Sequence, residues 1–205
     1  MDDWKSTLLA VFSFVLRTID ESNNVPPPSE AVTSTWTTEG NYSNYFVELL
    51  HSLNDGLKDR ISVVITTVSR CICEDCDWCD EDETTGLTIS LHMEHCSTIQ
   101  SLFDSLLETS YYAFREGVGV WPSDVCTAYT LTTTSYIIVE NTNVPTSRHA
   151  DGNNTGNTQI TVSEIRYVLI AVVFKKQGNV MTAVATEGGA MPSITSWYFA
   201  IYKRI

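Results

Sequence analysis

The chain of 205 residues has the length of one domain, and 43% hydrophobic residues are enough to fill a core. It carries 25 acidic and 12 basic residues, which give a formal net charge of −13. Such a surface repels phosphate backbones and anionic membranes. Because no cluster of Lys and Arg exists to release counterions, we expect no direct binding to nucleic acid. The acidity favours a protein partner with a basic surface.

No targeting segment is convincing at the start of the chain. The apolar run at 7–16 has the length of a signal-peptide core, but Asp2 and Asp3 precede it where positive charge is usual. It is also too short to span a bilayer, and Ser13 interrupts it. We therefore expect an intracellular, by default cytoplasmic, protein without a transmembrane segment. The acidic, Ser-, Thr- and Asn-rich composition is compatible with a viral or accessory protein.

Residues 1–43 are interpreted as an N-terminal helix followed by a proline-containing connector. Apolar residues recur at helical spacing from Trp4 to Ile19, which predicts an amphipathic helix over 3–20. Its apolar stripe has two interpretations: packing on its own domain, or docking on a partner. Residues 21–43 contain three consecutive prolines and read as an extended connector.

Residues 44–205 are interpreted as one globular domain, whose first half mixes helices with strands. A short helix is expected at 45–53, ended by Asn54, Asp55 and Gly56. The runs at 61–72 and 87–93 alternate like strands, and we expect them to pair as a hairpin around an acidic loop. Helical spacing then returns over 97–115, with Ser97 as N-cap and Gly117 as the stop.

The last third of the sequence is expected to be rich in strands, at 127–140, 159–175, 179–187 and 194–204. The turn at 176–179 predicts a hairpin, and the apolar run at 168–174 predicts a central strand covered on both faces. The aromatic residues near the C-terminus indicate a packed strand or, as the alternative, an exposed binding strip. The fold class is α+β, a mainly antiparallel sheet with two or three packing helices in a single domain.

The concentrated chemical signal lies at 71–96, where five of the six cysteines and two of the four histidines gather among acidic residues. Thiolates and imidazoles at such short spacing are the ligands that a tetrahedral Zn²⁺ prefers. We therefore predict a structural zinc site in this acidic Cys-rich loop. The candidate ligands are Cys71, Cys73, Cys76, Cys79, His92, His95 and Cys96.

Other interpretations of these cysteines stay open. Seven candidates compete for four zinc positions, and reduced thiols, disulfides or an iron–sulfur cluster are the alternatives. The neighbouring acids lack the glycine and closing Glu of an EF-hand, so a solvated acidic tip is favoured over a calcium loop. No H-E-x-x-H pattern supports catalytic zinc. A nucleophilic pair of Cys126 with His149 is the remaining catalytic hypothesis.

The sequence thus favours a non-enzymatic protein-interaction or assembly subunit. It would contact its partner through the acidic, zinc-stabilised loop and the amphipathic N-terminal helix, with Trp36 and Trp78 as further contacts. One alternative is a zinc- or cysteine-dependent hydrolase. A second is an acidic nucleic-acid mimic that inhibits a DNA- or RNA-binding protein. An oligomer is compatible with the sequence.

Overall fold

The computed structural model describes residues 3–20, 42–71, 79–91, 98–108, 110–113, 124–142, 158–176, 180–186 and 197–205. Most of the expected connector and of the polar loop at 141–158 lies outside these ranges, as do Trp36 and Trp78. The helices are α1 (Asp3–Ile19), α3 (Tyr42–His51), α4 (Asp55–Ile61) and α5 (Ile99–Leu107). The strands are β1 (Val63–Cys71), β2 (Cys79–Gly86), β3 (Ile89–Leu91), β4 (Ser110–Ala113), β5 (Asp124–Thr133), β6 (Tyr136–Asn141), β7 (Gln159–Val162), β8 (Ile165–Lys176), β9 (Val180–Ala185) and β10 (Trp197–Arg204).

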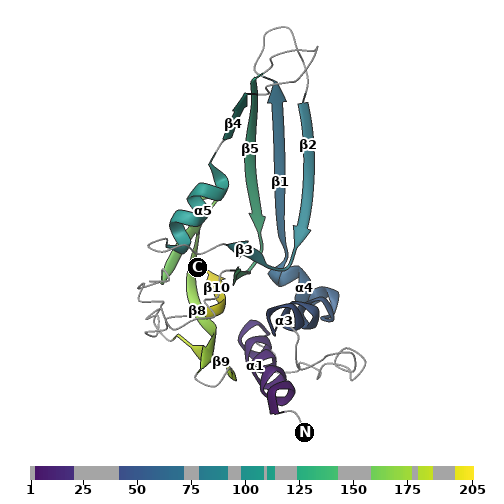
Figure 1. Cartoon of the computed structure of the whole chain (residues 1–205), viewed down its shortest axis with the longest axis vertical. Coiled ribbons are helices and arrows are strands. Elements are labelled where there is room, and N and C mark those ends of the chain that lie inside the picture. The colour runs from purple at the N-terminus through teal and green to yellow at the C-terminus, as the bar shows by residue number, and fades with distance from the viewer. Residues whose placement is uncertain are drawn as a thin grey trace.

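The strands form two sheets (Figure 1). Sheet A has four strands in the order β2-β1-β5-β4, and all its pairs are antiparallel. Sheet B has six strands in the order β3-β6-β10-β8-β7, with β9 also pairing with β8. The α+β class is confirmed. Two details differ from the expectation: β3 runs parallel to β6, so sheet B is mixed, and the described ranges hold four helices.

The expected hairpin between 61–72 and 87–93 is wrong. Strand β1 pairs instead with β2, which begins at Cys79 inside the stretch interpreted as a loop. β3 belongs to the other sheet. The run of acids suggested a loop because charged residues are rare in strands with a buried face. β2 tolerates them because it is an edge strand whose side chains are exposed on both faces.

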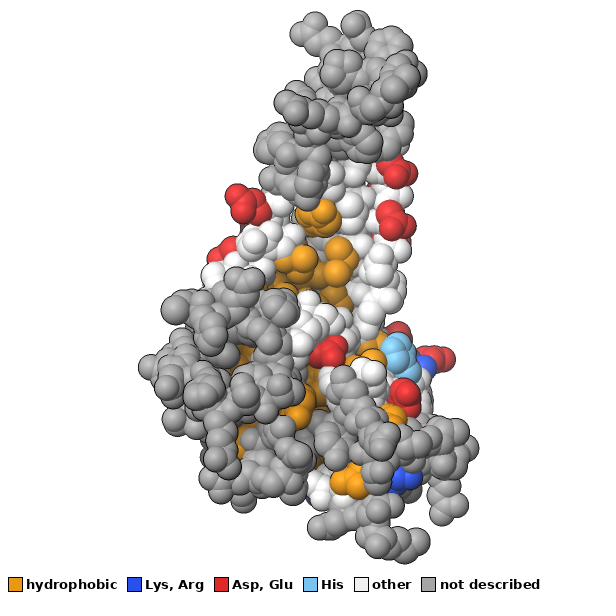
Figure 2. All heavy atoms as spheres, in the orientation of Figure 1, with side chains coloured by type: hydrophobic (Ala, Val, Ile, Leu, Met, Phe, Trp, Pro, Cys, Tyr) orange, Lys and Arg blue, Asp and Glu red, His pale blue; other side chains and the backbone are white. Residues whose placement is uncertain are grey.

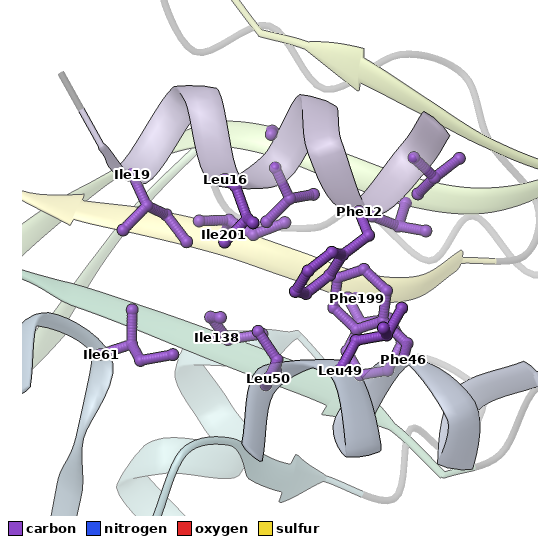
Figure 3. Close-up of a cluster of buried hydrophobic side chains, with 14 of the residues drawn as sticks. Phe12, Leu16, Ile19, Phe46, Leu49, Leu50, Ile61, Ile138, Phe199 and Ile201 are labelled. Carbon is purple, nitrogen blue, oxygen red and sulfur yellow. The ribbon is translucent and has the colours of Figure 1, made fainter. Parts of the chain in front are cut away.

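Helix α1 packs within the chain, which confirms the first interpretation of its apolar stripe. Figure 3 shows Phe12, Leu16 and Ile19 of α1 pointing toward side chains of sheet B, such as Ile201, and of α3, such as Leu50. Phe46 of α3 contacts Phe12 edge to face, with ring centroids 5.7 Å apart. Because its apolar stripe is buried here, α1 does not offer that stripe to a partner.

Two helix boundaries differ from the expected ones. Asn54, expected as a helix stop, is the N-cap of the additional helix α4, since its side-chain oxygen accepts a hydrogen bond from the Leu57 amide at 3.0 Å. Helix α5 starts after Thr98, which forms a capping box with Ser101, and it ends at Leu107. The expected continuation to 115 is wrong because residues 110–113 form β4 and pair with β5.

Sheet B carries a hydrophobic core on each face. One core joins it to α1 and α3, and the other joins it to α5 and to the lower end of sheet A. Ala171 and Val173 of β8 belong to the first core, and Leu169 and Val172 to the second, so the expected central strand is confirmed. The expected hairpin of β8 with β9 is also confirmed. β10 is packed in the sheet, so the alternative of an exposed aromatic strip is wrong.

Among the described helices, none combines the length and the hydropathy needed to cross a membrane.

Candidate protein-interaction surface

Sheet A projects from the rest of the molecule (Figure 1). The base of the sheet lies in the second core, where Val63 at the start of β1 and Leu131 near the end of β5 are buried. From Val63 to Arg70 strand β1 advances about 24 Å, at about 3.4 Å per residue. The far half of the sheet therefore extends well beyond both cores.

Polar contacts attach the base of sheet A to sheet B. The Ser163 hydroxyl, in the turn between β7 and β8, donates to the Leu131 carbonyl at 2.9 Å. Thr133 at the end of β5 hydrogen-bonds through its hydroxyl to the buried phenol of Tyr167 in β8. Ser163 and Glu164 hold positive φ angles of 47° and 67° in that turn. These contacts join the projecting strands to the packed body at defined points.

Helix α5 supports one face of sheet A at its base. Ile65 and Leu131 share the second core with Phe103 and Leu106 of α5. The side chain of Gln100 also binds both backbone groups of Thr161 in β7, donating to its carbonyl at 2.9 Å and accepting from its amide at 2.7 Å. We call the side of sheet A that carries Ile65 the α5 face.

In the described ranges, the opposite side of sheet A, which we call the open face, contributes no side chain to either hydrophobic core. Val64 and Val68 lie on it, and neither belongs to or packs against either hydrophobic core. Both are half-buried, and Thr130 and Thr132 beside them are exposed. Cross-strand partners share a face. The registers therefore place these residues together on the open face: Val64, Thr66, Val68, Arg70, Cys126, Ala128, Thr130, Thr132, Cys79, Glu81, Glu83 and Thr85.

Strand β2 gives sheet A an acidic margin. Its residues Asp80, Glu81, Asp82 and Glu83 are all exposed. Figure 2 shows acidic side chains along the β2 side of the projecting sheet and hydrophobic ones over its middle. The acidic run is visible in the sequence, but the open face is not, because the Val and Thr residues of β1 indicate a strand without showing which of its faces stays uncovered.

The structure places part of the predicted zinc ligand set at the far end of sheet A. Cys71 ends β1 and Cys79 starts β2, and the register pairs Cys79 with Arg70, the residue before Cys71. Cys79 is exposed. Cys73 and Cys76 lie outside the described residues, in the segment that joins these two strand ends.

The other predicted ligands, His92, His95 and Cys96, also lie outside the described residues. The residues that flank them are Leu91, which pairs with Asn141 in sheet B, and Thr98, which caps α5. Both flanks belong to the body of the molecule. Cys71 and Cys79 are therefore the two predicted ligands that the described ranges contain.

No group of three or more His, Cys, Asp or Glu side chains in the described ranges is arranged to hold a metal ion. Cys126 lies on β5, where the register pairs it with Arg70, and it is a partly exposed free thiol. Its hypothetical partner His149 is outside the described residues, so the catalytic pair stays a prediction.

Comparison with known proteins gives a similarity in fold. No family model matches the sequence, and no curated protein matches it. One similar solved structure is a SAGA DUB module of Ubp8, Sgf11, Sus1 and Sgf73 bound to monoubiquitin. It has a TM-score of 0.52 and 11% identity, over 79% of this chain and 47% of that chain.

A second structure of the SAGA DUB module has a TM-score of 0.53 and 12% identity, over 82% of this chain and 49% of that chain. The chain thus spans about half the length of these neighbours. At this identity the similarity concerns the fold alone.

Proposed function

We propose that this chain is a non-enzymatic protein-interaction subunit that holds a folded partner against the open face of sheet A. The observation that carries the proposal is the position of Val64 and Val68, on a projecting sheet and outside both cores. Apolar side chains that keep part of their surface exposed on a sheet can supply the buried centre of an interface. The zinc- or cysteine-dependent hydrolase and the nucleic-acid mimic stay alternative hypotheses.

Ubiquitin is the partner we propose first. A structural neighbour that shares the fold over 79% of this chain is a module bound to monoubiquitin. The open face has half-buried Val64 and Val68 at its centre and Glu81 and Glu83 at its margin. A partner that fits it presents an apolar patch with basic residues at one side. This refines the expectation of a basic partner surface.

The test is calorimetric titration of the full chain with monoubiquitin, using two matched variants. Val68→Arg places a long cation in the middle of the open face. Thr67→Arg places the same side chain on the α5 face, one residue away on the same strand. We expect the unmodified chain and Thr67→Arg to bind with similar affinity, and Val68→Arg to bind at least tenfold more weakly.

Both variants must keep the thermal unfolding midpoint of the unmodified chain, which controls for misfolding. Equal weakening by both variants would reject the open face as the docking surface. If the unmodified chain gave no heat of binding in the titration and caused no chemical-shift change in isotope-labelled ubiquitin, ubiquitin would be rejected as the partner.

We also propose a structural zinc ion at the far end of sheet A. Cys71 and Cys79 stand at the paired ends of β1 and β2, and the segment between them carries Cys73 and Cys76. Four thiolates from one hairpin meet the ligand number of a closed tetrahedral site. A bound ion would fix the tip of the projecting sheet without supplying any reaction.

Metal analysis with thiol counting tests this proposal on protein purified without chelator or histidine tag. We expect about one zinc per chain and about four thiols that react only after chelation. Cys73→Ser together with Cys76→Ser should abolish zinc binding, and Cys126→Ser should leave it unchanged. If the folded protein as purified contained no metal and all its thiols reacted without chelation, the proposed zinc site at the far end of sheet A would be contradicted.

A further inference from the structure

We propose that the outer edge of β2 is a second docking surface, which pairs with an extended Lys- and Arg-rich segment of a partner protein by strand addition. Glu81 and Glu83 of β2 also border the open face, but the surface proposed here is the backbone edge of the strand, and the inference does not depend on ubiquitin as a partner. Backbone groups at the edge supply the pairing, and the acidic side chains select the occupant.

The backbone of β2 is open on its outer side. β2 is the terminal strand of sheet A, and in the described ranges it pairs with β1 alone. Side chains from Cys79 to Thr85 are exposed on both faces, so neither face of the strand is covered. Figure 1 shows β2 at the margin of the sheet with no described element beside it. In an antiparallel edge strand, alternate residues direct their N–H and C=O groups outward.

The charges on this edge determine what can pair with it. The register puts Asp80 and Asp82 on the α5 face and Glu81 and Glu83 on the open face. No described basic residue forms an ion pair with any of these four. Residues two apart in a strand are about 7 Å apart. An added strand therefore meets two carboxylates on each of its faces, and consecutive Lys or Arg residues match them.

The same charges exclude other occupants. Pairing of two β2 edges from two copies would bring four carboxylates against four, so self-association through this edge is disfavoured. An acidic or purely apolar strand lacks the compensating charge. The simplest competing explanation is that the acids only protect the edge from aggregation, and it predicts no backbone pairing with any peptide.

The test is fluorescence anisotropy with the full chain and a labelled peptide that carries four consecutive lysines between Thr and Val residues. The control peptide has the same charge but a proline in the middle of the basic run, which removes strand pairing and keeps the attraction. We expect the control peptide to bind at least tenfold more weakly, and binding of the first peptide to weaken as salt rises.

Two charge-matched double variants localise the site. Asp80→Asn with Asp82→Asn removes two charges of β2 that lie on the α5 face and outside the open face. Asp59→Asn with Glu108→Gln removes two exposed charges elsewhere. We expect about tenfold weaker binding for the β2 variant and no more than a twofold change for the control. Equal binding of both peptides, equal loss in both variants, or no binding at low salt would each overturn the proposal.

Discussion

Tyr202 in β10 is a residue whose burial has a measurable chemical consequence. Its side chain has no exposed area, and desolvation raises the pKa of the phenol well above its ordinary value of 10.0. The charged form is therefore disfavoured in the folded state. In the unfolded chain the phenol ionises near its ordinary pKa.

This difference predicts a loss of stability in alkali. The contribution of Tyr202 is fully present below about pH 10 and is lost as the pH rises toward the raised pKa of the folded state. Over that window this one group lowers the free energy of unfolding by up to about 1.4 kcal/mol per pH unit. Urea unfolding at several pH values above 10 should show a shallower decline for Tyr202→Phe. The same slope in both proteins would contradict the assignment.

The position and burial of single residues can be predicted from the sequence where a single physical effect, such as the helical spacing of apolar side chains, determines them. The spacing from Trp4 to Ile19 fixed both the helix α1 and the residues it buries. The prediction that Asn54 only ends a helix is incomplete, because a residue that follows one helix can also be the N-cap of the next. The metal candidates at 71–96 are close in sequence, and β2 and β3 lie between Cys71 and His92 along the chain. Whether all seven candidates meet at one ion stays a prediction, because five of them lie outside the described residues.

The sequence predicts a helix or strand well where the burial of its side chains determines the structure. It predicts a strand poorly where pairing with a distant strand determines it. The apolar run of β8 indicated a central strand directly. Strand β2 has no buried face, so its sequence holds no alternation to read. β4 follows α5 with aromatic residues that fit a helix as well as a strand, and only pairing with β5 decides. Long-range pairing of this kind is not encoded in a local window.

The two sheets should differ in local stability. β8 and β10 are buried on both faces, whereas β2 is exposed and pairs with β1 alone among the described strands. Amide hydrogen exchange followed by mass spectrometry should show β2 exchanging on the order of a thousandfold faster than β8. Addition of the lysine peptide should slow exchange in β2 and leave β8 unchanged. Protection of β2 as strong as that of β8 in the free chain would mean that its edge is already covered.

At the scale of the whole molecule, the chain consists of a packed body and a projecting sheet. The body joins α1, α3, α5 and sheet B through two cores. Sheet A is attached to it by Val63, Leu131 and the hydrogen bonds of Ser163 and Thr133. This arrangement supports the proposal that the body acts as a support and the sheet contacts the partner. The acidic surface read from the sequence is in part concentrated on β2.

The most direct test of this account is chemical-shift mapping on the isotope-labelled full chain during titration with monoubiquitin. We predict that the shifts change at Val64, Val68 and Ala128 on the open face, and that buried residues of β8 and β10 do not respond. Shift changes confined to the body, or spread evenly over both faces of sheet A, would contradict the claim that the open face is the docking surface.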